Sequence, residues 1–430
     1  MTAADFIEGS PGTFALVSLG CAKNAADLQA AAGALVKRGW RLSGDRTRAD
    51  VAIVNTCAFI ASAREEAESE IARALELKRR GRYGRVVVSG CYPQRYPEAA
   101  AKFPGVDSWR GVPKGWDEPA VPALRFTGKA FAYLKIAEGC NRRCAYCAIP
   151  SIRGRFSSRP AASILREAEA LVGSGCREIN IVAQDPMSWG RDLKPRSSLV
   201  SLLRMLDGIE GDFWLRVLYS HPASIDADFI AWMVASPHAV RYIDMPVQHT
   251  VPEVLAAMGR KNAIDATLFL PDFLRETIPG LVLRTTVMTG HPGETEKRFG
   301  RMRADLRRMQ FDRLGAFAYS PEKGTASAKL GGRASAATAE ERRRTIMADA
   351  AALWRARAKL AIGSTARALV VAPGVARLPS QAPDVDGVAW LLDSPKARKA
   401  APGDFVEVRV AAARGFDFEV EVVRFFGKEG

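Results

Sequence analysis

The loop that follows the apolar stretch at residues 132–136 carries three cysteines, Cys140, Cys144 and Cys147, in the pattern C-x3-C-x2-C. Three thiolates on one short loop can each bind one iron of a cubane iron–sulfur cluster and leave the fourth iron open. An open iron can chelate a small molecule through an amino and a carboxylate group. The spacing therefore predicts a 4Fe-4S cluster with a site for a small-molecule ligand.

Simpler interpretations of these cysteines remain open on spacing alone. Closely spaced cysteines also bind zinc, but a structural zinc site needs four ligands, and the nearest further cysteine, Cys176, lies on a different predicted element. The three can also be ordinary thiols. A disulfide framework is disfavoured, because the chain is long, its seven cysteines are odd in number and no export signal precedes them.

A second set of cysteines, Cys21, Cys57 and Cys91, has a shared topological position. Each follows an apolar stretch that predicts a β-strand, at residues 14–19, 51–55 and 85–89. The carboxyl ends of parallel strands meet at one edge of a sheet, so these thiols are expected to meet in space. Taken singly, each is most simply a buried small hydrophobe. Taken together, they predict the ligands of a second cluster.

The alternation of apolar strands and amphipathic helices predicts an α/β architecture. Residues 14–110 predict a doubly wound parallel-sheet domain with helices on both faces. Residues 131–325 repeat a strand–helix unit and predict a central partial (β/α)6 barrel, with its active site at the carboxyl ends of the strands. Its candidate strands are 132–137, 178–183, 213–219, 241–246, 281–288 and 314–319. An Ala- and Arg-rich helix is predicted over 326–364, after a break at Gly331 and Gly332. A hairpin at 404–410 and 416–422 predicts a C-terminal small β-barrel.

Composition bounds the cellular setting. The N-terminus lacks the basic and apolar segments of a signal peptide, and the chain has no run of about eighteen apolar residues, so we expect a cytoplasmic protein with no membrane partner. A net charge of +15 suggests an anionic partner such as RNA or the ribosome, although solubility or a base-composition bias explains it equally well. Basic residues concentrate at 328–365, whereas residues 365–430 carry nine basic and nine acidic side chains.

The whole chain resembles the methylthiotransferases, which are radical S-adenosylmethionine (SAM) enzymes. Their auxiliary-cluster segments are matched by SLGCAKN (18–24), VNTC (54–57) and SGC (89–91). Around the C-x3-C-x2-C loop the matches are Tyr146, IP (149–150), RG (153–154) and SRP (158–160), and later come GHPGET (290–295) and YSPEKGT (319–325). The resemblance implies an N-terminal cluster domain at 12–118, a radical-SAM barrel with a trailing helix at 126–362, and a TRAM β-barrel at 363–430.

Several stretches resemble the family branch that modifies an aspartate of ribosomal protein uS12. They are AQD (183–185), WGRD (189–192), RVLY (216–219) and YIDMPVQH (242–249). Gln248 and His249 matter most, since tRNA-modifying members usually have Gln-Ser-Gly there, although His249 is equally explained as a structural histidine. Departures from the usual residues occur at Ala22, at 28–29, at 259–261 and at His291, and none of them removes a cysteine.

The resemblance also implies roles. A 4Fe-4S cluster on Cys140, Cys144 and Cys147 binds SAM and reduces it to a 5′-deoxyadenosyl radical, which takes hydrogen from the aspartate β-carbon. A second 4Fe-4S cluster, on Cys21, Cys57 and Cys91, presents the sulfur that a second SAM methylates. Candidate SAM-binding residues are Tyr146, Gln184 and Glu294. The implied partners are uS12, free or in the small ribosomal subunit, and a reduced flavodoxin- or ferredoxin-type electron donor. The Arg-rich helix at 342–359 suggests contact with ribosomal RNA, although a solvated helix face explains it equally well.

Two other functions fit the same residues. A tRNA adenosine methylthiotransferase would perform the same chemistry on a different substrate, but the neutral tail favours a protein substrate, because phosphate contacts are made by Lys and Arg. A non-catalytic zinc-containing RNA-binding protein would use the cysteines only as structural ligands.

Overall fold

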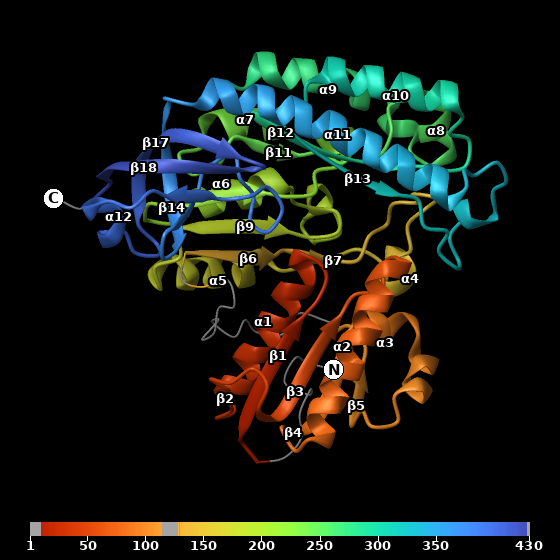
Figure 1. Cartoon of the computed structure of the whole chain (residues 1–430), viewed down its shortest axis with the longest axis vertical. Coiled ribbons are helices and arrows are strands. Elements are labelled where there is room, and N and C mark those ends of the chain that lie inside the picture. Colours follow the sequence, from red (N-terminus) through yellow and green to blue (C-terminus); the bar gives the residue numbers. More distant parts are fainter. Residues whose placement is uncertain (1–9, 114–127, 129, 428–430) are drawn as a thin grey trace.

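The computed structural model describes residues 10–113, 128 and 130–427, which form three parts (Figure 1). An N-terminal sheet domain lies against one edge of a central barrel, and a small β-barrel packs at the other side of that central barrel. The boundary predicted between residues 118 and 126 lies outside the described residues. None of the described helices is long and apolar enough to cross a membrane.

The N-terminal domain is built on a five-stranded, fully parallel sheet in the order β2-β1-β3-β4-β5. Apolar cores cover both of its faces, one around Leu28 and Leu35 of α1 and one around Ala67 and Ile71 of α2. The predicted doubly wound domain is thus confirmed. Its elements are β1 (Thr13–Ser18), α1 (Ala22–Lys37), β2 (Arg41–Leu42), β3 (Ala49–Thr56), α2 (Ala61–Arg79), β4 (Tyr83–Gly90), α3 (Cys91–Arg95), a 3-10 helix (Pro97–Lys102) and β5 (Ser108–Arg110).

The central part is an open barrel of six parallel strands. They form two three-stranded sheets, β10-β9-β6 and β11-β12-β13, which an isolated parallel bridge between Leu215 and Ala239 connects. All six strands lie where the sequence predicted them. The strands are β6 (Phe131–Lys135), β9 (Glu178–Val182), β10 (Trp214–Val217), β11 (Tyr242–Asp244), β12 (Val282–Thr289) and β13 (Arg313–Ala318).

Helices cover the convex side of this barrel. Two short strands lie in the segment that connects β6 to the first long helix of the barrel. Along α5, Ile164, Ala168 and Leu171 are buried on one face against the strands, as their helical spacing predicted. The remaining elements are β7 (Ala137–Glu138), α4 (Ile149–Arg153), β8 (Ser157–Ser158), α5 (Ala161–Gly173), α6 (Leu199–Asp207), α7 (Ala227–Ala235), α8 (Pro252–Ala257), α9 (Ile264–Thr277) and α10 (Glu296–Met309).

The trailing helix, α11 (Ala336–Ala361), begins later than the predicted residue 326. The Ser335 hydroxyl accepts a hydrogen bond from the Thr338 amide at 3.0 Å and so caps the helix there, while Gly332, at φ +71°, turns the chain just before it. A closed five-stranded barrel follows, in the order β14-β15-β16-β18-β17. Its elements are β14 (Thr365–Ala372), β15 (Val375–Arg377), β16 (Ala389–Leu391), α12 (Pro395–Lys399), β17 (Phe405–Arg414) and β18 (Asp417–Phe425).

The loop between β15 and β16 closes the concave side of the open central barrel. Tyr133 of β6 donates to Asp384 of this loop at 2.6 Å, and Arg216 of β10 donates to the Pro379 carbonyl at 2.9 Å. A buried ion-pair triad anchors the same end: Glu178 accepts from Arg216 at 2.9 Å and also pairs with Arg377. These three side chains are 0 to 3% exposed, so the C-terminal barrel is fixed to the central one by charge inside the protein.

Neutralising Glu178 should destabilise the chain strongly. In Glu178→Gln, two buried guanidinium groups lose their carboxylate, and we expect the free energy of unfolding to fall by about 3 to 5 kcal/mol. Urea denaturation followed by circular dichroism measures this. The control is Asp393→Asn, which removes the exposed pair with Arg398 and should change stability little. Equal, small losses in both variants would contradict the anchoring role of Glu178.

Candidate functional site

The first cysteine set lies at the carboxyl edge of the N-terminal sheet. Cys21 immediately precedes α1, Cys57 follows β3, and Cys91 begins α3 directly after β4. Gly20 packs so closely on Cys57 that a Cβ at Gly20 would lie 2.6 Å from the Cys57 Cβ. The Cys91 thiol contacts Asn24 of α1, Sγ to Oδ1, at 3.6 Å. The structure thus brings these three cysteines together, as the parallel topology predicted.

The pKa values of this set reflect burial and mutual repulsion. Burial raises the pKa of Cys57 to about 11, and the neighbouring Cys91 thiolate adds to the rise. Burial likewise raises the pKa of Cys91. Burial opposes ionisation of Cys21 too, but the charges of Lys23 and Arg153 and the backbone amides of Asn24 and Lys23 together outweigh it, so the pKa of Cys21 falls below its usual value. Burial thus opposes ionisation of Cys57 and Cys91, and a bound metal cation would favour their thiolate forms.

The second set lies on the loop between β7 and α4, at the carboxyl edge of the central barrel. Backbone amides point at two of its sulfurs: Arg142 N–H donates to Cys140 Sγ and Ile149 N–H to Cys147 Sγ, each at 3.4 Å. All three cysteines line one hollow of about 570 Å³. Burial raises the pKa of Cys140 to about 11 and that of Cys147 to about 12.

Each set offers three thiols, the number that binds a cubane cluster with one open iron. Across residues 10–113, 128 and 130–427, no three His, Cys, Asp or Glu side chains are placed to hold one metal ion. Zinc needs its thiolates to converge within about 2.3 Å of one point, whereas a cubane binds each thiolate on a separate iron. Arginines 142, 143 and 155 line the hollow beside the second set, where their charge would offset that of a bound anionic cluster.

Two of the three candidate SAM-binding residues lie at the same carboxyl edge as the second set. Gln184, just beyond β9, donates from Nε2 to Glu138 Oε1 at 2.8 Å, and its own buried Oε1 has no partner in the described structure. Tyr146 lies between Cys144 and Cys147; its hydroxyl accepts from Arg260 at 3.2 Å. An orphaned amide oxygen beside the cysteine loop is the kind of group that a bound ligand would satisfy.

Glu294, the third candidate, is occupied by protein partners. Its Oε1 accepts from the Gly290 amide at 2.7 Å and from Arg342 at 2.9 Å. Its Oε2 lies 3.2 Å from His249 Nε2, and His249 Nδ1 accepts from the Val251 amide at 3.0 Å, so Nε2 carries the proton and donates to Glu294. Both ring nitrogens of the fully buried His249 therefore have hydrogen-bond partners within the protein, and Glu294 stabilises this edge of the barrel.

Sequence reasoning missed two strained residues at the same edge. Tyr219 and Gln248, at the ends of β10 and β11, have φ values of +68° and +69°, a left-handed conformation that non-glycine residues rarely adopt. Such strain clusters at binding sites. The Lys23 ammonium lies 3.5 Å from the centre of the Tyr219 ring, so the first cysteine set reaches this edge. Gln248 was named only as a branch marker, and no sequence signal specifies a positive φ there.

It also missed the contact between the two domains. Arg153, on α4 directly after the second cysteine set, donates to Asp27 of α1 at 2.6 Å and to Cys91 Sγ at 3.3 Å. The sequence marked Arg153 only as part of a motif. Cys176, by contrast, is buried at the opposite edge of the barrel, where its thiol donates to the Glu178 carbonyl at 3.3 Å.

Family models match all three parts of the chain. Residues 13–111 match the Uncharacterized protein family UPF0004, residues 134–306 the Radical SAM superfamily and residues 362–423 the TRAM domain. A solved structure, the radical S-adenosylmethionine methyltransferase TsrM from Kitasatospora setae with cobalamin and [4Fe-4S] cluster bound, is similar in fold, with a TM-score of 0.55 and 17% identity over 74% of this chain and 77% of that one.

Curated relatives match nearly the full length. The ribosomal protein uS12 methylthiotransferase RimO of Syntrophus aciditrophicus (strain SB) is 38% identical over 95% of this chain and 98% of its own. The protein of the same name from Elusimicrobium minutum (strain Pei191) is 34% identical over 93% of this chain and 97% of its own. Similarity of this extent is shared by whole proteins rather than by one domain. The chain therefore belongs to the ribosomal protein uS12 methylthiotransferase RimO family.

Proposed function

We propose that this protein is a methylthiotransferase that adds a methylthio group to the β-carbon of an aspartate of ribosomal protein uS12. One observation carries the proposal: the protein has two sets of three cysteines, one on each of two domains. Arg153, which follows the second set in sequence, contacts Asp27 and Cys91 beside the first set. Full-length similarity to proteins named for uS12 supports this substrate. The enzyme is a sulfur-transferring transferase that uses SAM and 4Fe-4S clusters.

The reaction needs cofactors because the target C–H bond is unactivated and no side chain is basic enough to remove that hydrogen as a proton. When bound, SAM and the two clusters supply a carbon-centred radical for hydrogen abstraction and a sulfur for transfer. We assign the ligands of the SAM-binding cluster as Cys140, Cys144 and Cys147, and those of the auxiliary cluster as Cys21, Cys57 and Cys91. The rest of the chain must hold the two sets, orient the substrate and exclude water.

Three further side chains have proposed roles in SAM binding. Gln184 offers its unpartnered Oε1 to a donor group of SAM. Tyr146 lies on the cysteine loop, where its hydroxyl accepts a hydrogen bond from Arg260 at 3.2 Å. Glu294 acts indirectly: by fixing His249 and the Gly290 amide it sets the shape of the carboxyl edge.

The surface suggests how partners approach. The three arginines beside the second cysteine set would suit an acidic flavodoxin- or ferredoxin-type electron donor. Ribosomal RNA contact is proposed for α11, on which Arg344, Arg355 and Lys359 are exposed. The equal numbers of acidic and basic residues after 365 support uS12 over tRNA as the substrate. We propose that the enzyme works in the cytoplasm, on uS12 that is free or in the small ribosomal subunit.

Removing one ligand from either set should remove one cluster. We expect anaerobically reconstituted wild-type protein to hold about eight irons, and Cys91→Ala or Cys147→Ala to hold about four. Iron and sulfide analysis with absorption spectroscopy measures this. The matched control is Cys176→Ala, also a buried cysteine, which should keep the full iron content. Full iron in Cys91→Ala would remove it from the ligand set, and a colourless protein with bound zinc would overturn the cluster assignment.

Mass spectrometry tests the substrate. Reconstituted enzyme, SAM and a reductant are incubated anaerobically with uS12 and, separately, with bulk tRNA. We expect a methylthio mass gain on a uS12 aspartate, abolished in Cys91→Ala. A gain on tRNA adenosine alone would keep the chemistry and overturn the substrate. No gain on either, with SAM still cleaved, would contradict the proposed function.

A further inference from the structure

A four-membered charge network joins the N-terminal domain to the central barrel between the two cysteine sets. Arg153 Nη1 contacts Asp27 Oδ2 at 2.6 Å and Glu138 Oε2 at 3.1 Å, and Lys135 Nζ pairs with the same two carboxylates. The Arg153 side chain is 1% exposed and that of Asp27 10%. Two cations and two anions balance, as buried charges must.

Arg153 also reaches into the first cysteine set. Its Nη2 lies 3.3 Å from Cys91 Sγ and hydrogen-bonds Asn24 Oδ1. Asn24 in turn donates to the carbonyls of Leu19 and Thr56, at 3.1 and 2.9 Å, which are the ends of the strands that carry Cys21 and Cys57. One guanidinium on the helix that follows Cys147 is thus linked, directly or through Asn24, to all three elements of the other set.

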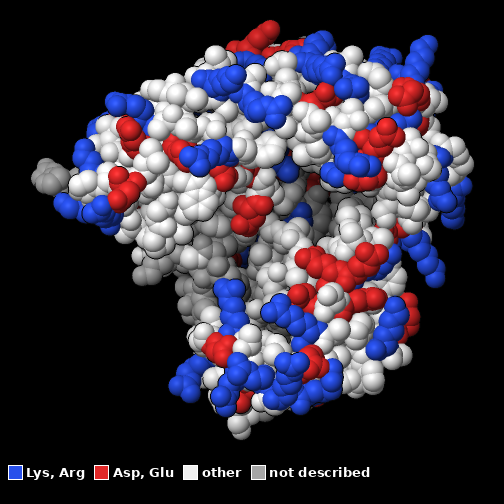
Figure 2. All heavy atoms as spheres, in the orientation of Figure 1, with Lys and Arg blue, Asp and Glu red and all other residues white. Residues whose placement is uncertain are grey.

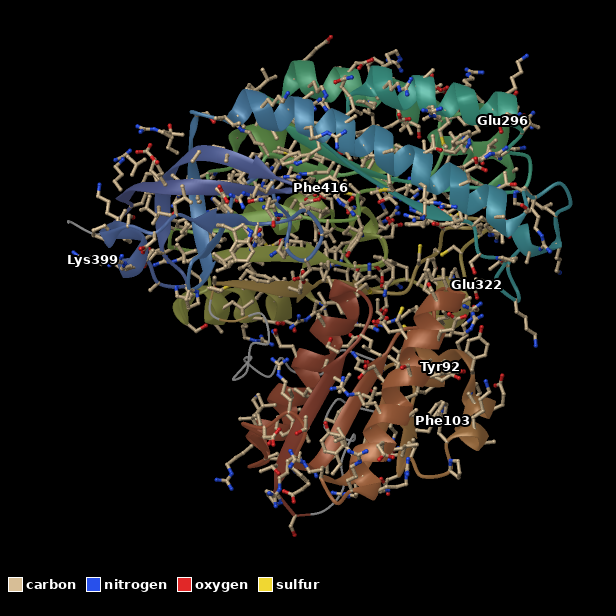
Figure 3. All side chains as sticks on the ribbon, in the orientation of Figure 1. Tyr92, Phe103, Glu296, Glu322, Lys399 and Phe416 are labelled. Atoms are coloured by element: carbon tan, nitrogen blue, oxygen red, sulfur yellow. The ribbon has the colours of Figure 1, made fainter. Side chains whose placement is uncertain are left out.

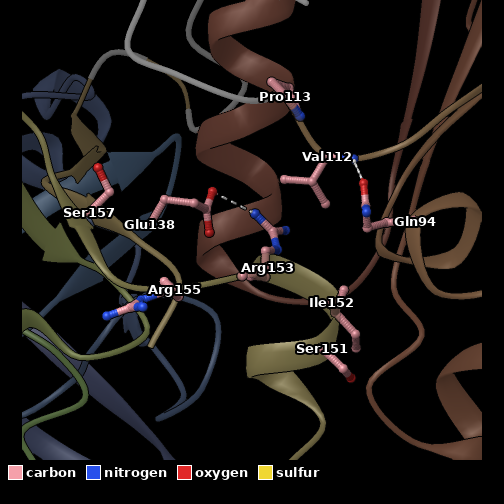
Figure 4. Close-up of a pocket in the computed structure, with 10 residues that line it drawn as sticks. Gln94, Val112, Pro113, Glu138, Ser151, Ile152, Arg153, Arg155 and Ser157 are labelled. Atoms are coloured by element: carbon pink, nitrogen blue, oxygen red, sulfur yellow. Dashed lines mark hydrogen bonds and ion pairs between the residues drawn. The ribbon is translucent and has the colours of Figure 1, made fainter. Parts of the chain in front are cut away.

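The interface combines this network with apolar packing, since Ile152, next to Arg153, is buried in the apolar core of the N-terminal domain. A hollow of about 330 Å³ opens beside the network, lined by Gln94 and Val112 from the N-terminal domain and by Glu138, Arg153 and Arg155 from the barrel. Figure 4 shows Arg153 pointing across this hollow toward Glu138. On the face drawn in Figure 2, the surface is likewise recessed between the two domains. On the side of the hollow, the ion pairs of Arg153 are the contacts that set its orientation between the two domains.

The domains have a second polar contact, which does not involve Arg153 or Asp27. Glu322, after β13, pairs with Arg64 at 2.6 Å and Arg95 at 3.1 Å, both on the N-terminal domain. In Figure 3, Glu322 lies at the end of the N-terminal domain that meets the barrel, above Tyr92. Weakening the network at Arg153 leaves this contact in place, so the domains stay docked while their alignment changes.

We propose that Arg153 and Asp27 are positioning residues, which set how the Cys21–Cys57–Cys91 set faces the Cys140–Cys144–Cys147 set. The inference rests on the proposed function for its consequence: sulfur held at one set has to meet a substrate radical generated beside the other. Loosening the network uncouples the two half-reactions, because misplacement by about 1 Å can cost on the order of a hundredfold in rate. SAM cleavage needs only the second set and continues.

The test compares Asp27→Asn and Arg153→Lys with wild-type holoenzyme. Each is reconstituted to the same iron content and supplied with SAM, reductant and uS12, and both 5′-deoxyadenosine and methylthiolated product are quantified. We expect 5′-deoxyadenosine formation to continue and product per 5′-deoxyadenosine to fall about tenfold or more. The matched control is Asp312→Asn: Asp312 also pairs with two arginines, Arg275 and Arg357, but on the far side of the barrel, and its product ratio should not change.

A second readout needs no substrate. Electron paramagnetic resonance of the reduced holoenzyme reports the magnetic interaction between the two clusters, which depends on their separation and orientation. We expect this interaction to change in Asp27→Asn and Arg153→Lys and to match wild type in Asp312→Asn. This arm stands even if wild-type enzyme fails to methylthiolate uS12, an outcome that would contradict the proposed function alone.

Two results would overturn the inference. One is an unchanged product ratio together with an unchanged magnetic interaction in both variants. The other is loss of iron from the first set in both variants, which would mean that the network holds a cluster rather than aligns it.

Discussion

The guanidinium of Arg153 is stable inside the protein only because carboxylates from two domains meet it there. An isolated buried charge costs several kcal/mol, and Asp27 of the N-terminal domain supplies half of the compensation. Docking of the domains and neutralisation of Arg153 are therefore one event. Because Arg153 follows Cys147 by a single helix and lies beside Cys91, that event also brings the two cysteine sets into their mutual arrangement.

The C-terminal barrel is attached by the same physical means at the opposite end. Glu178 lies at the amino-terminal start of β9, and its partners Arg216 and Arg377 come from two different parts of the chain. This attachment fills the concave side of the central barrel with the loop after β15. The C-terminal barrel leaves the carboxyl edge of the central barrel uncovered. That edge carries the cysteine loop, Gln184 and the strained Tyr219 and Gln248.

Local patterns predicted the elements and both cysteine sets, because parallel strands buried on both faces are continuous apolar runs and end at a common edge. The predicted start of the trailing helix at residue 326 was wrong: α11 begins at Ala336, after the glycine break, where Ser335 caps it. The pairing of Asp27 with Arg153 spans 126 residues, and Glu294 is enclosed by Arg342, 48 residues away. Contacts of that range depend on how whole domains dock, and no spacing in the sequence encodes them.

The order of the docking residues along the chain has a consequence for biosynthesis. Domains fold as units during translation, the N-terminal one first. Asn24 and Asp27 leave the ribosome well before Arg153, which lies 129 and 126 residues farther on. The first sheet therefore folds with its three thiols at an edge that no barrel yet covers. Cys21, Cys57 and Cys91, the proposed ligands of the auxiliary cluster, are therefore most accessible while the rest of the chain is still being made.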